Sequence, residues 1–203
     1  MSRDRTTKAT RLLTTSPPAV EPVSVAELKA SARINFIDDD AVLAGVLLQA
    51  RQWVERVASI RLITQAVVVY RDDWRRTMYL PLGPIQSVTA IEYLATNGTS
   101  QTLAASGYAV DVTSTPPCII IPASTALPAL QADRPNRVMV EAIAGYGDAG
   151  SDVPQPILEA IKLYAQAQYD LTVAAVQQNA RGIEAMMTAA HNLLAPYWMD
   201  GYQ

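Results

Sequence analysis

The sequence predicts an α+β protein in which helices near the two ends of the chain form a small bundle and a β-rich insertion of short antiparallel strands lies between them. Two observations carry this prediction. Apolar residues recur every three or four positions over residues 40–58 and 157–175, as on the buried face of a helix. Between these segments, residues 62–144 are rich in β-branched and aromatic side chains and are interrupted by prolines, which is typical of short strands.

The 203 residues suffice for one domain with an insertion, and shifts in composition divide them into four parts. Residues 1–23 are a flexible basic arm, and residues 24–60 hold the N-terminal helices of the body. Residues 61–147 form the β-rich insertion, and residues 148–203 hold the C-terminal helices and a tail. We expect these parts to make one domain overall.

The first helix is predicted over residues 25–32, because Ser24 and Glu27 form a capping-box pattern. Residues 35–38 make a turn. Asp38, Asp39 and Asp40 open the next helix, where carboxylates accept hydrogen bonds from free backbone amides. Its apolar stripe continues to about Ala58, and its solvent side is marked by Arg51, Glu55 and Arg56.

Six strands are predicted from β-branched and aromatic runs, over residues 62–70, 77–80, 88–94, 108–112, 118–121 and 138–144. Asn97-Gly98 predicts a hairpin that joins the third of these to a further strand at 101–103, because such a turn accepts positive φ. Residues 123–136 contain several small and turn-forming residues and are expected to be a surface loop.

Gly145-Tyr146-Gly147 is expected to end the last strand. Pro154 and Pro156 then open a helix, since proline is tolerated in a first turn, and its stripe continues to about Ala175. A weaker helical stretch is predicted over residues 183–194, separated from the previous one by residues 177–179 and Gly182.

Composition excludes several function classes. A formal net charge of −3 argues against a protein that reads DNA sequence. A single cysteine cannot form a disulfide within the chain or a thiolate zinc cluster. No apolar run approaches the roughly 18 residues that span a bilayer, so we expect no membrane partner. Only 17% of residues are charged, which favours a surface that contacts another protein.

Residues that could carry chemistry have simpler interpretations. Three consecutive aspartates at a helix start point in different directions, which favours a helix-start role for Asp38–Asp40 over a metal site. His191 has no second histidine to work with, and we interpret it as a surface or contact residue. Cys118 is flanked by apolar residues and is expected to be buried. Gly145–Gly147 lacks the spacing and the lysine of a phosphate-binding loop. We therefore expect no catalytic, cofactor or metal site.

Basic residues gather in two places. Arg71, Arg75 and Arg76 surround Trp74, a combination that fits a nucleic-acid contact, but the neighbouring aspartates favour a solvated turn or an intersubunit salt bridge. The better DNA-facing candidates lie in the basic arm: Arg3, Arg5, Lys8 and Arg11.

Several short stretches carry a family resemblance through their order. They are Glu21–Lys29, Asp38–Asp40, Ala50–Glu55, Leu62–Gln65, Pro81–Val88, Ala144–Gly147, Val153–Ile157 and Leu193–Tyr197. Each stretch is a capping, turn or core pattern that also occurs elsewhere. In this order, over about residues 21–197, they resemble the head-tail connector (adaptor) proteins of long-tailed bacteriophages and related gene-transfer particles.

The resemblance implies a structural protein with no cofactor. Such a protein would form a homo-oligomeric ring of about twelve copies (a dodecamer) beneath the portal protein, where it continues the DNA channel toward the tail. Its other partners would be a head-completion (stopper) or tail-terminator protein and double-stranded DNA passing without sequence specificity. It would be made in the bacterial host cytoplasm and reside in the neck of the virion. Twelve copies, each with a net charge of −3, suit a channel that must not grip DNA.

Candidate contact residues follow from this implied role and from the apolar stripes. The end of the chain would dock onto the portal, although Trp198-Met199-Asp200 departs from the basic residue that commonly follows the Pro-Tyr pair in the family. The docking candidates are Met186, Met187, Leu193, Leu194, Tyr197 and Trp198. The candidates for subunit packing are Val42, Val46, Trp53, Val57, Ile157, Ile161 and Tyr164.

Two alternatives belong to other function classes. A small-ligand or carbohydrate-binding module of a phage-like particle would use an enclosed pocket lined by aromatic residues, for which the candidates are Trp74, Tyr79, Tyr93 and Tyr108. A hydrolase would need two carboxylates facing each other across a cleft, and Asp38, Asp39 and Asp111 are its candidates.

Overall fold

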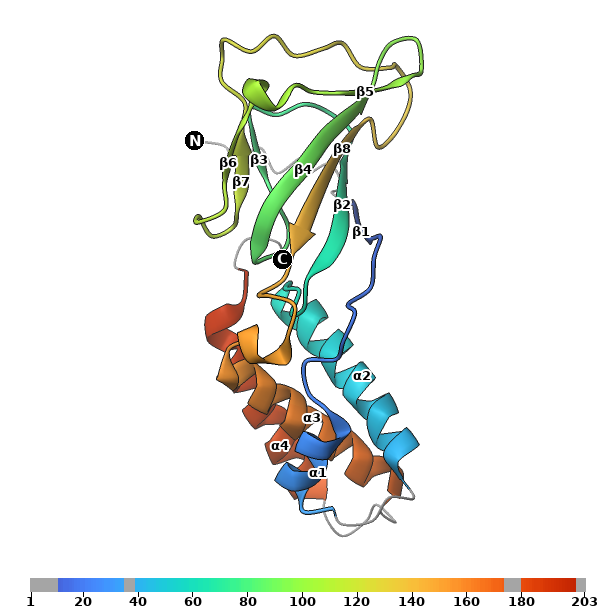
Figure 1. Ribbon diagram of the computed structural model, residues 1–203, viewed down its shortest axis with the longest axis vertical. Coiled ribbons are helices and arrows are strands. Elements are labelled where there is room, and N and C mark those ends of the chain that lie inside the picture. The colour runs from blue at the N-terminus through green and yellow to red at the C-terminus, as the bar shows by residue number, and fades with distance from the viewer. Residues whose placement is uncertain (1–10, 35–38, 174–179, 200–203) are drawn as a thin grey trace. The chain divides into compact units, whose positions relative to one another are not determined.

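The computed structural model describes residues 11–34, 39–173 and 180–199, and the chain divides into two compact units. The β unit comprises residues 65–145 together with the segment up to Pro17. The helical unit comprises Pro18–Thr64 and Tyr146–Met199. Helices and antiparallel sheets occupy separate stretches of the sequence (Figure 1), which confirms the predicted α+β class.

The β unit contains two antiparallel sheets. The larger has the order β1-β2-β8-β4-β5, and the smaller has the order β3-β7-β6. The strands of the larger sheet are β1 (Arg11–Thr14), β2 (Gln65–Arg71), β8 (Val138–Ala144), β4 (Ile85–Leu94) and β5 (Ser100–Thr102). Those of the smaller sheet are β3 (Thr77–Tyr79), β7 (Cys118–Ile120) and β6 (Ala109–Asp111), with the short helix η1 (Ala105–Gly107) before β6.

One apolar core serves both sheets. β8 alternates buried and half-buried residues along its whole length, as expected for a strand with one face on a core. Val140 from β8, Ile91 from β4, Met78 from β3 and Ile119 from β7 belong to the same buried cluster. Cys118 is buried as predicted.

The Asn97-Gly98 turn joins β4 to β5 as predicted. Gly98 has φ +82°, a conformation that side chains rarely adopt, and the Asn97 side chain accepts a hydrogen bond from the Thr99 amide at 3.1 Å. The loop over residues 123–136 is also confirmed, with one isolated bridge between Leu130 and Ala95.

The predicted flexible arm over residues 1–23 is corrected at residues 11–14. Arg11–Thr14 forms β1 and pairs antiparallel with β2, with Leu12 opposite Val69. Leu12 also packs against the core of the β unit. This strand was missed because its partner lies more than fifty residues away and no turn signal connects them. The other part of the arm, residues 1–10, lies outside the described residues.

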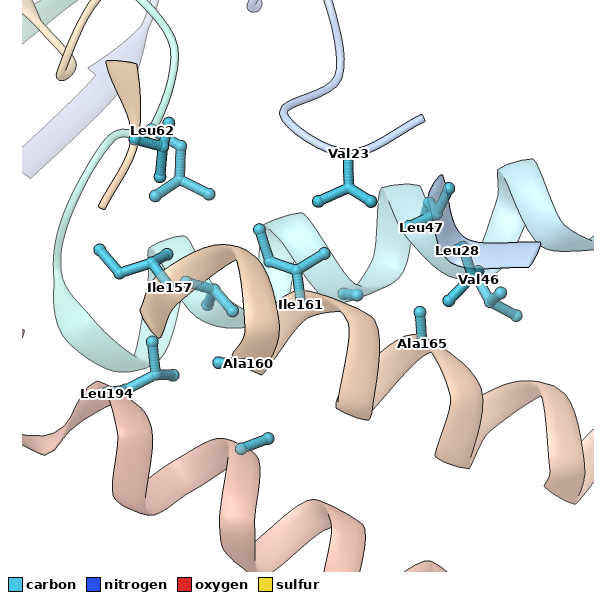
Figure 2. Close-up of a cluster of buried hydrophobic side chains, with 14 of the residues drawn as sticks. Val23, Leu28, Val46, Leu47, Leu62, Ile157, Ala160, Ile161, Ala165 and Leu194 are labelled. Carbon is cyan, nitrogen blue, oxygen red and sulfur yellow. The ribbon is translucent and has the colours of Figure 1, made fainter. Parts of the chain in front are cut away.

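The helical unit contains four helices among the described residues: α1 (Val25–Ala32), α2 (Asp40–Ala58), α3 (Gln155–Val173) and α4 (Ala180–Leu194). The unit also has two short 3₁₀ helices, η2 (Gly150–Asp152) directly before α3 and η3 (Ala195–Tyr197) directly after α4. α3 contacts each of the other three helices. Figure 2 shows the core that results, in which Ile157 and Ile161 of α3 lie among side chains of the other segments.

The predicted helix starts are confirmed in one case and corrected in the other. Ser24 and Glu27 form the reciprocal capping box. Asp39 is the N-cap of α2 but makes no capping hydrogen bond with its side chain, because its carboxylate accepts from the Tyr169 hydroxyl instead. Asp40 forms an ion pair with Lys29 at 2.7 Å. Asp38 and the predicted turn at 35–38 lie outside the described residues.

Several boundaries differ from the sequence prediction, and two of them concern the helical unit. Leu62 and Ile63, expected in the first strand, are buried in the core of the helical unit, and β2 begins only at Gln65. Gly182, expected to interrupt the helices, lies inside α4, which is a regular helix of 15 residues. Residues 177–179 lie outside the described residues.

Candidate assembly surfaces

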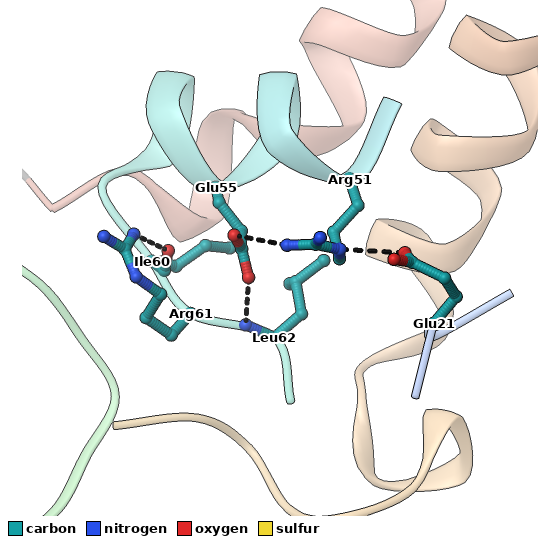
Figure 3. Close-up of polar contacts among 6 residues, drawn as sticks. All are labelled: Glu21, Arg51, Glu55, Ile60, Arg61 and Leu62. Carbon is teal, nitrogen blue, oxygen red and sulfur yellow. Dashed lines mark hydrogen bonds and ion pairs between the residues drawn. The ribbon is translucent and has the colours of Figure 1, made fainter. Parts of the chain in front are cut away.

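A buried ionic cluster fixes the C-terminal half of α2 (Figure 3). Arg51 donates through Nε to Glu21 at 2.8 Å and through Nη1 to Glu55 at 3.1 Å. Glu55 also accepts from the backbone amide of Leu62 at 3.2 Å. We predicted Arg51 and Glu55 on the solvent side, but each is only 7% exposed. They are buried because each charge has a partner, which is what burial of a charge requires.

The same cluster holds the segment that follows α2. Arg61 donates through Nη1 to the carbonyl of Ile60 at 2.9 Å. Burial lowers the pKa of Arg61, with Glu55 acting in the opposite direction. Ser59, in the left-handed region at φ 54°, ends the helix. These contacts tie residues 60–62 to α2, and the opposite charges of the cluster neutralise one another.

The residues proposed for subunit packing do not share one location. Val46, Ile157 and Ile161 are buried in the core of their own helical unit. Trp53 stacks on Tyr164 with ring centroids 4.2 Å apart and planes 11° apart, and both rings are half-buried. The remaining two are Val57, which is half-buried, and Val42, which is 42% exposed.

The exposed side of α2 combines apolar and polar residues. Leu48 is 41% exposed, close to the value for Val42. Further along α2, a hollow at the surface of the helical unit is lined by Gln49, Gln52, Trp53, Arg56 and Tyr164. Large exposed apolar residues beside an aromatic pair are typical of contact surfaces between proteins. Sequence reasoning named Val42 and Trp53 but missed Leu48, because Leu48 lies off the apolar stripe that it used.

The residues proposed for portal docking lie on the C-terminal part of the helical unit. Leu194 is fully buried, and Leu193, Tyr197 and Trp198 pack against the same core. The backbone amide of Met199 donates to the carbonyl of Ala58 at 3.2 Å. Met186 and Met187 of α4 are half-buried. Most of this segment therefore stabilises its own subunit.

His191 is exposed on α4, as predicted, and its ring meets the edge of Trp198 with centroids 4.8 Å apart. On the outward side of α4 is a shallow hollow lined by Arg181, Glu184, Ala185, Thr188, Ala189 and Asn192. Sequence reasoning missed this surface, although its small residues at helical spacing were a visible signal.

The DNA-facing candidates are only partly described. Arg11 is exposed on β1, whereas Arg3, Arg5 and Lys8 lie outside the described residues. The second basic group is tied to its own β unit. Arg76 donates to the carbonyls of Pro122 at 2.6 Å and Thr125 at 2.8 Å.

The aromatic candidates for a ligand pocket lie in the β unit, and three of the four pack within it. Trp74 donates to the carbonyl of Pro128 at 2.9 Å and packs near Tyr93, with ring centroids 5.6 Å apart. Tyr93 is buried and Tyr108 packs on the core, whereas Tyr79 is half exposed. These four rings do not line the two hollows described above.

The carboxylate candidates have local roles. Asp111 accepts hydrogen bonds from Thr113 and Ser114, which lower its pKa. The hydrogen bond to Asp39 is the main reason that the pKa of Tyr169 rises to about 12. Among residues 11–34, 39–173 and 180–199, no group of three or more His, Cys, Asp or Glu side chains could hold a metal ion. Within the same ranges, no helix has the length and hydropathy needed to cross a bilayer.

Of the comparisons with known proteins, the one with solved structures finds a shared architecture. No family model matches the sequence, and no curated protein matches it. Solved structures do match it. A chain from the neck of an empty GTA particle, computed with C6 symmetry, is 22% identical with a TM-score of 0.74, and the match covers 95% of this chain and 97% of that one.

Two further structures give the same result. A chain from the neck of the native GTA particle, computed with C12 symmetry, is 23% identical with a TM-score of 0.71, covering 96% of this chain and 97% of that one. A chain from the virion of the native gene transfer agent (GTA) particle is 23% identical with a TM-score of 0.70, covering 87% and 93%. The chain therefore shares its fold, over almost its whole length, with components of gene transfer agent particles.

Proposed function

We propose that this protein is a structural component of the neck of a tailed phage or phage-like particle, where it acts as a head-tail connector. The observation that carries the proposal is the fold match over nearly the full length of both chains to the neck structures of GTA particles. The order of short sequence stretches over residues 21–197 supports the same role independently of the fold match.

In this role, about twelve copies form a ring beneath the portal and continue the DNA channel toward the tail. The matched neck structures were computed with C6 and C12 symmetry, which supports a ring. A ring closes when one face of a subunit meets a different face of the next, so it needs two complementary surfaces and no active site. The helical unit has a buried ionic cluster and an extensive core that would keep these surfaces rigid.

The mildly acidic chain suits passage of DNA. Each phosphate contact by a basic side chain adds affinity, which would slow a moving genome. A net charge of −3 for each copy opposes such retention. The portal would contact the C-terminal segment, with half-buried Met186 and Met187 as the accessible part, and a stopper or tail-terminator protein would bind the other side of the ring. As a structural part of the neck, the protein would not be an enzyme.

Deleting the gene from a cell that produces the particle tests this function. The connector role predicts heads and tails that accumulate separately, with no joined particles, and restoration of joined particles when the intact chain is supplied from a plasmid. Electron microscopy of the lysate measures this outcome. Joined particles in normal numbers without the protein would contradict the proposal.

A further inference from the structure

The two outermost long helices of the helical unit, α2 and α4, run in the same direction on different sides of α3. Tyr169 near the end of α3 bonds to Asp39 at the start of α2, so these two helices are antiparallel. α4 follows α3 after residues 174–179, and just beyond its end Met199 bonds to Ala58 at the end of α2. α3 packs against both, as Figure 1 shows, and each outer helix keeps one exposed side.

The exposed side of α2 is suited to close contact with another helix. Val42 and Leu48 are large apolar side chains left about two-fifths exposed. Between them lies Gly45, where an added Cβ would meet nothing within 4 Å in this chain. Glycine weakens the interior of a helix, and nothing inside the subunit requires it here. A partner backbone approaching this point would use the space that Gly45 leaves.

The exposed side of α4 offers a matching surface. Ala185, Thr188 and Ala189 leave a shallow hollow whose charged lining residues are Arg181 and Glu184. Small side chains at a contact between helices allow their axes to approach to about 8 Å. The projecting Val42 and Leu48 would thus meet a surface with room for them.

Opposite charges lie at the starts of the two helices. Arg181 lies in the first turn of α4, and Asp40 is the first residue of α2. Because the two helices begin at the same end of the helical unit, side-by-side packing of two copies would bring Arg181 near the start of the neighbouring α2, where Asp40 is an exposed carboxylate. The Asp40 side chain is 51% exposed despite its ion pair with Lys29, so it can accept a second partner.

We infer that the outer side of α4 on one copy packs against the outer side of α2 on the next copy, and that this contact closes the ring. The inference rests on the proposed function. Neighbours related by a twelvefold axis differ by only one twelfth of a turn, so helices that are parallel within a copy stay near parallel between copies. The contact is head-to-tail, because α4 meets α2 rather than another α4, as a closed ring requires.

Cysteine cross-linking tests the contact directly. The full-length chain carries Cys118→Ala together with Gly45→Cys and Ala185→Cys, and it is oxidised after assembly. Since α3 separates the two positions within one copy, only neighbouring copies can form the disulfide, which requires a Cβ–Cβ distance of about 3.5–4.5 Å. We expect a ladder of multimers on a non-reducing denaturing gel. The matched control replaces the Gly45 change with Ala26→Cys, an exposed position on α1, and should give no ladder.

A charge reversal gives a second readout that does not depend on disulfide geometry. Arg181→Glu should raise the concentration needed for half-assembly at least tenfold, and adding Asp40→Arg should recover most of the loss. Circular dichroism of each variant checks that it is folded.

The outcomes separate the contact from the function. A ladder, with recovery by the paired charges, supports the inference. Rings that form with neither a ladder nor any effect of Arg181→Glu overturn the contact but leave the connector role intact. A wild-type chain that forms no ring, either alone or mixed with the portal protein, overturns both.

Discussion

The guanidinium of Arg51 and the carboxylate of Glu55 lie 3.1 Å apart, one helical turn from each other and buried on α2. Glu21 completes the cluster from a segment thirty residues earlier, at 2.8 Å from Arg51. A buried charge is tolerated only with such partners, so the cluster fixes where residues 21, 51–55 and 60–62 meet.

Removing the charge of Glu55 should therefore destabilise the protein. Glu55→Gln leaves Arg51 buried beside the half-exposed Glu21 alone, and we expect a loss of about 3 kcal/mol in the free energy of unfolding, measured by urea denaturation. Glu159→Gln is the matched control, because it removes the 43% exposed carboxylate of the pair with Lys162, and it should cost less than about 1 kcal/mol. Equal effects of the two substitutions would show that the Arg51 cluster is not buried as described.

This cluster also shows where sequence reasoning ends. The apolar period of α2 predicted the helix and its approximate end at Ala58 correctly. It placed Arg51 and Glu55 in solvent because a periodicity argument treats every charge as exposed. Their burial depends on Glu21 and the Leu62 amide, which are near only after the chain has folded.

The Tyr169–Asp39 hydrogen bond predicts a loss of stability at high pH. The pKa of Tyr169 is raised to about 12 from 10.0, so its contribution is complete below pH 10 and disappears as the pH rises toward 12. Urea unfolding at pH 9 and pH 11 should show a falling midpoint for the wild type and a smaller fall for Tyr169→Phe. Burial raises the pKa of Tyr146 to about 12 as well, so Tyr169→Phe should flatten the profile only in part. Identical profiles for both proteins would contradict the hydrogen bond.

Two glycines should respond in opposite directions to the same substitution. A Cβ at Gly150 would overlap the carbonyl oxygen of Pro22, whereas at Gly45 it would meet nothing. Gly150→Ala should destabilise the monomer by about 1–3 kcal/mol through overpacking. Gly45→Ala should stabilise it by about 0.5–1 kcal/mol through helix propensity. Thermal or urea unfolding measures both, and a neutral Gly150→Ala would show that the close approach of Pro22 is absent.

The first strand can be tested with adjacent leucines. Leu12 packs against the core of the β unit, whereas Leu13 is 49% exposed. Leu12→Ala should cost about 1–2 kcal/mol, below the range for fully buried leucines, and Leu13→Ala should stay within about 0.5 kcal/mol of the wild type. If residues 11–14 were an arm without a partner strand, neither substitution would change the unfolding midpoint.

The strands and the contact surfaces differ in how far the sequence predicts them. Local patterns are enough for β8 and for the hairpin at Gly98, because their alternation and turn residues are read from neighbours. The exposed side of α2 and the hollow on α4 are the faces that stay uncovered when these helices pack against α3. Local sequence patterns do not determine this packing. The same limit explains why Leu194, chosen for docking, is buried in its own core.

The mass of the assembled protein tests the central claim most directly. The full-length chain is purified, mixed with the portal protein of its own particle, and measured by native mass spectrometry over a range of concentrations. A ring of twelve copies of the 21.9 kDa chain adds about 260 kDa in a single step. The account predicts that step, with no stable species of two or three added copies. A chain that stays at 21.9 kDa at every concentration, with and without the portal, would contradict it.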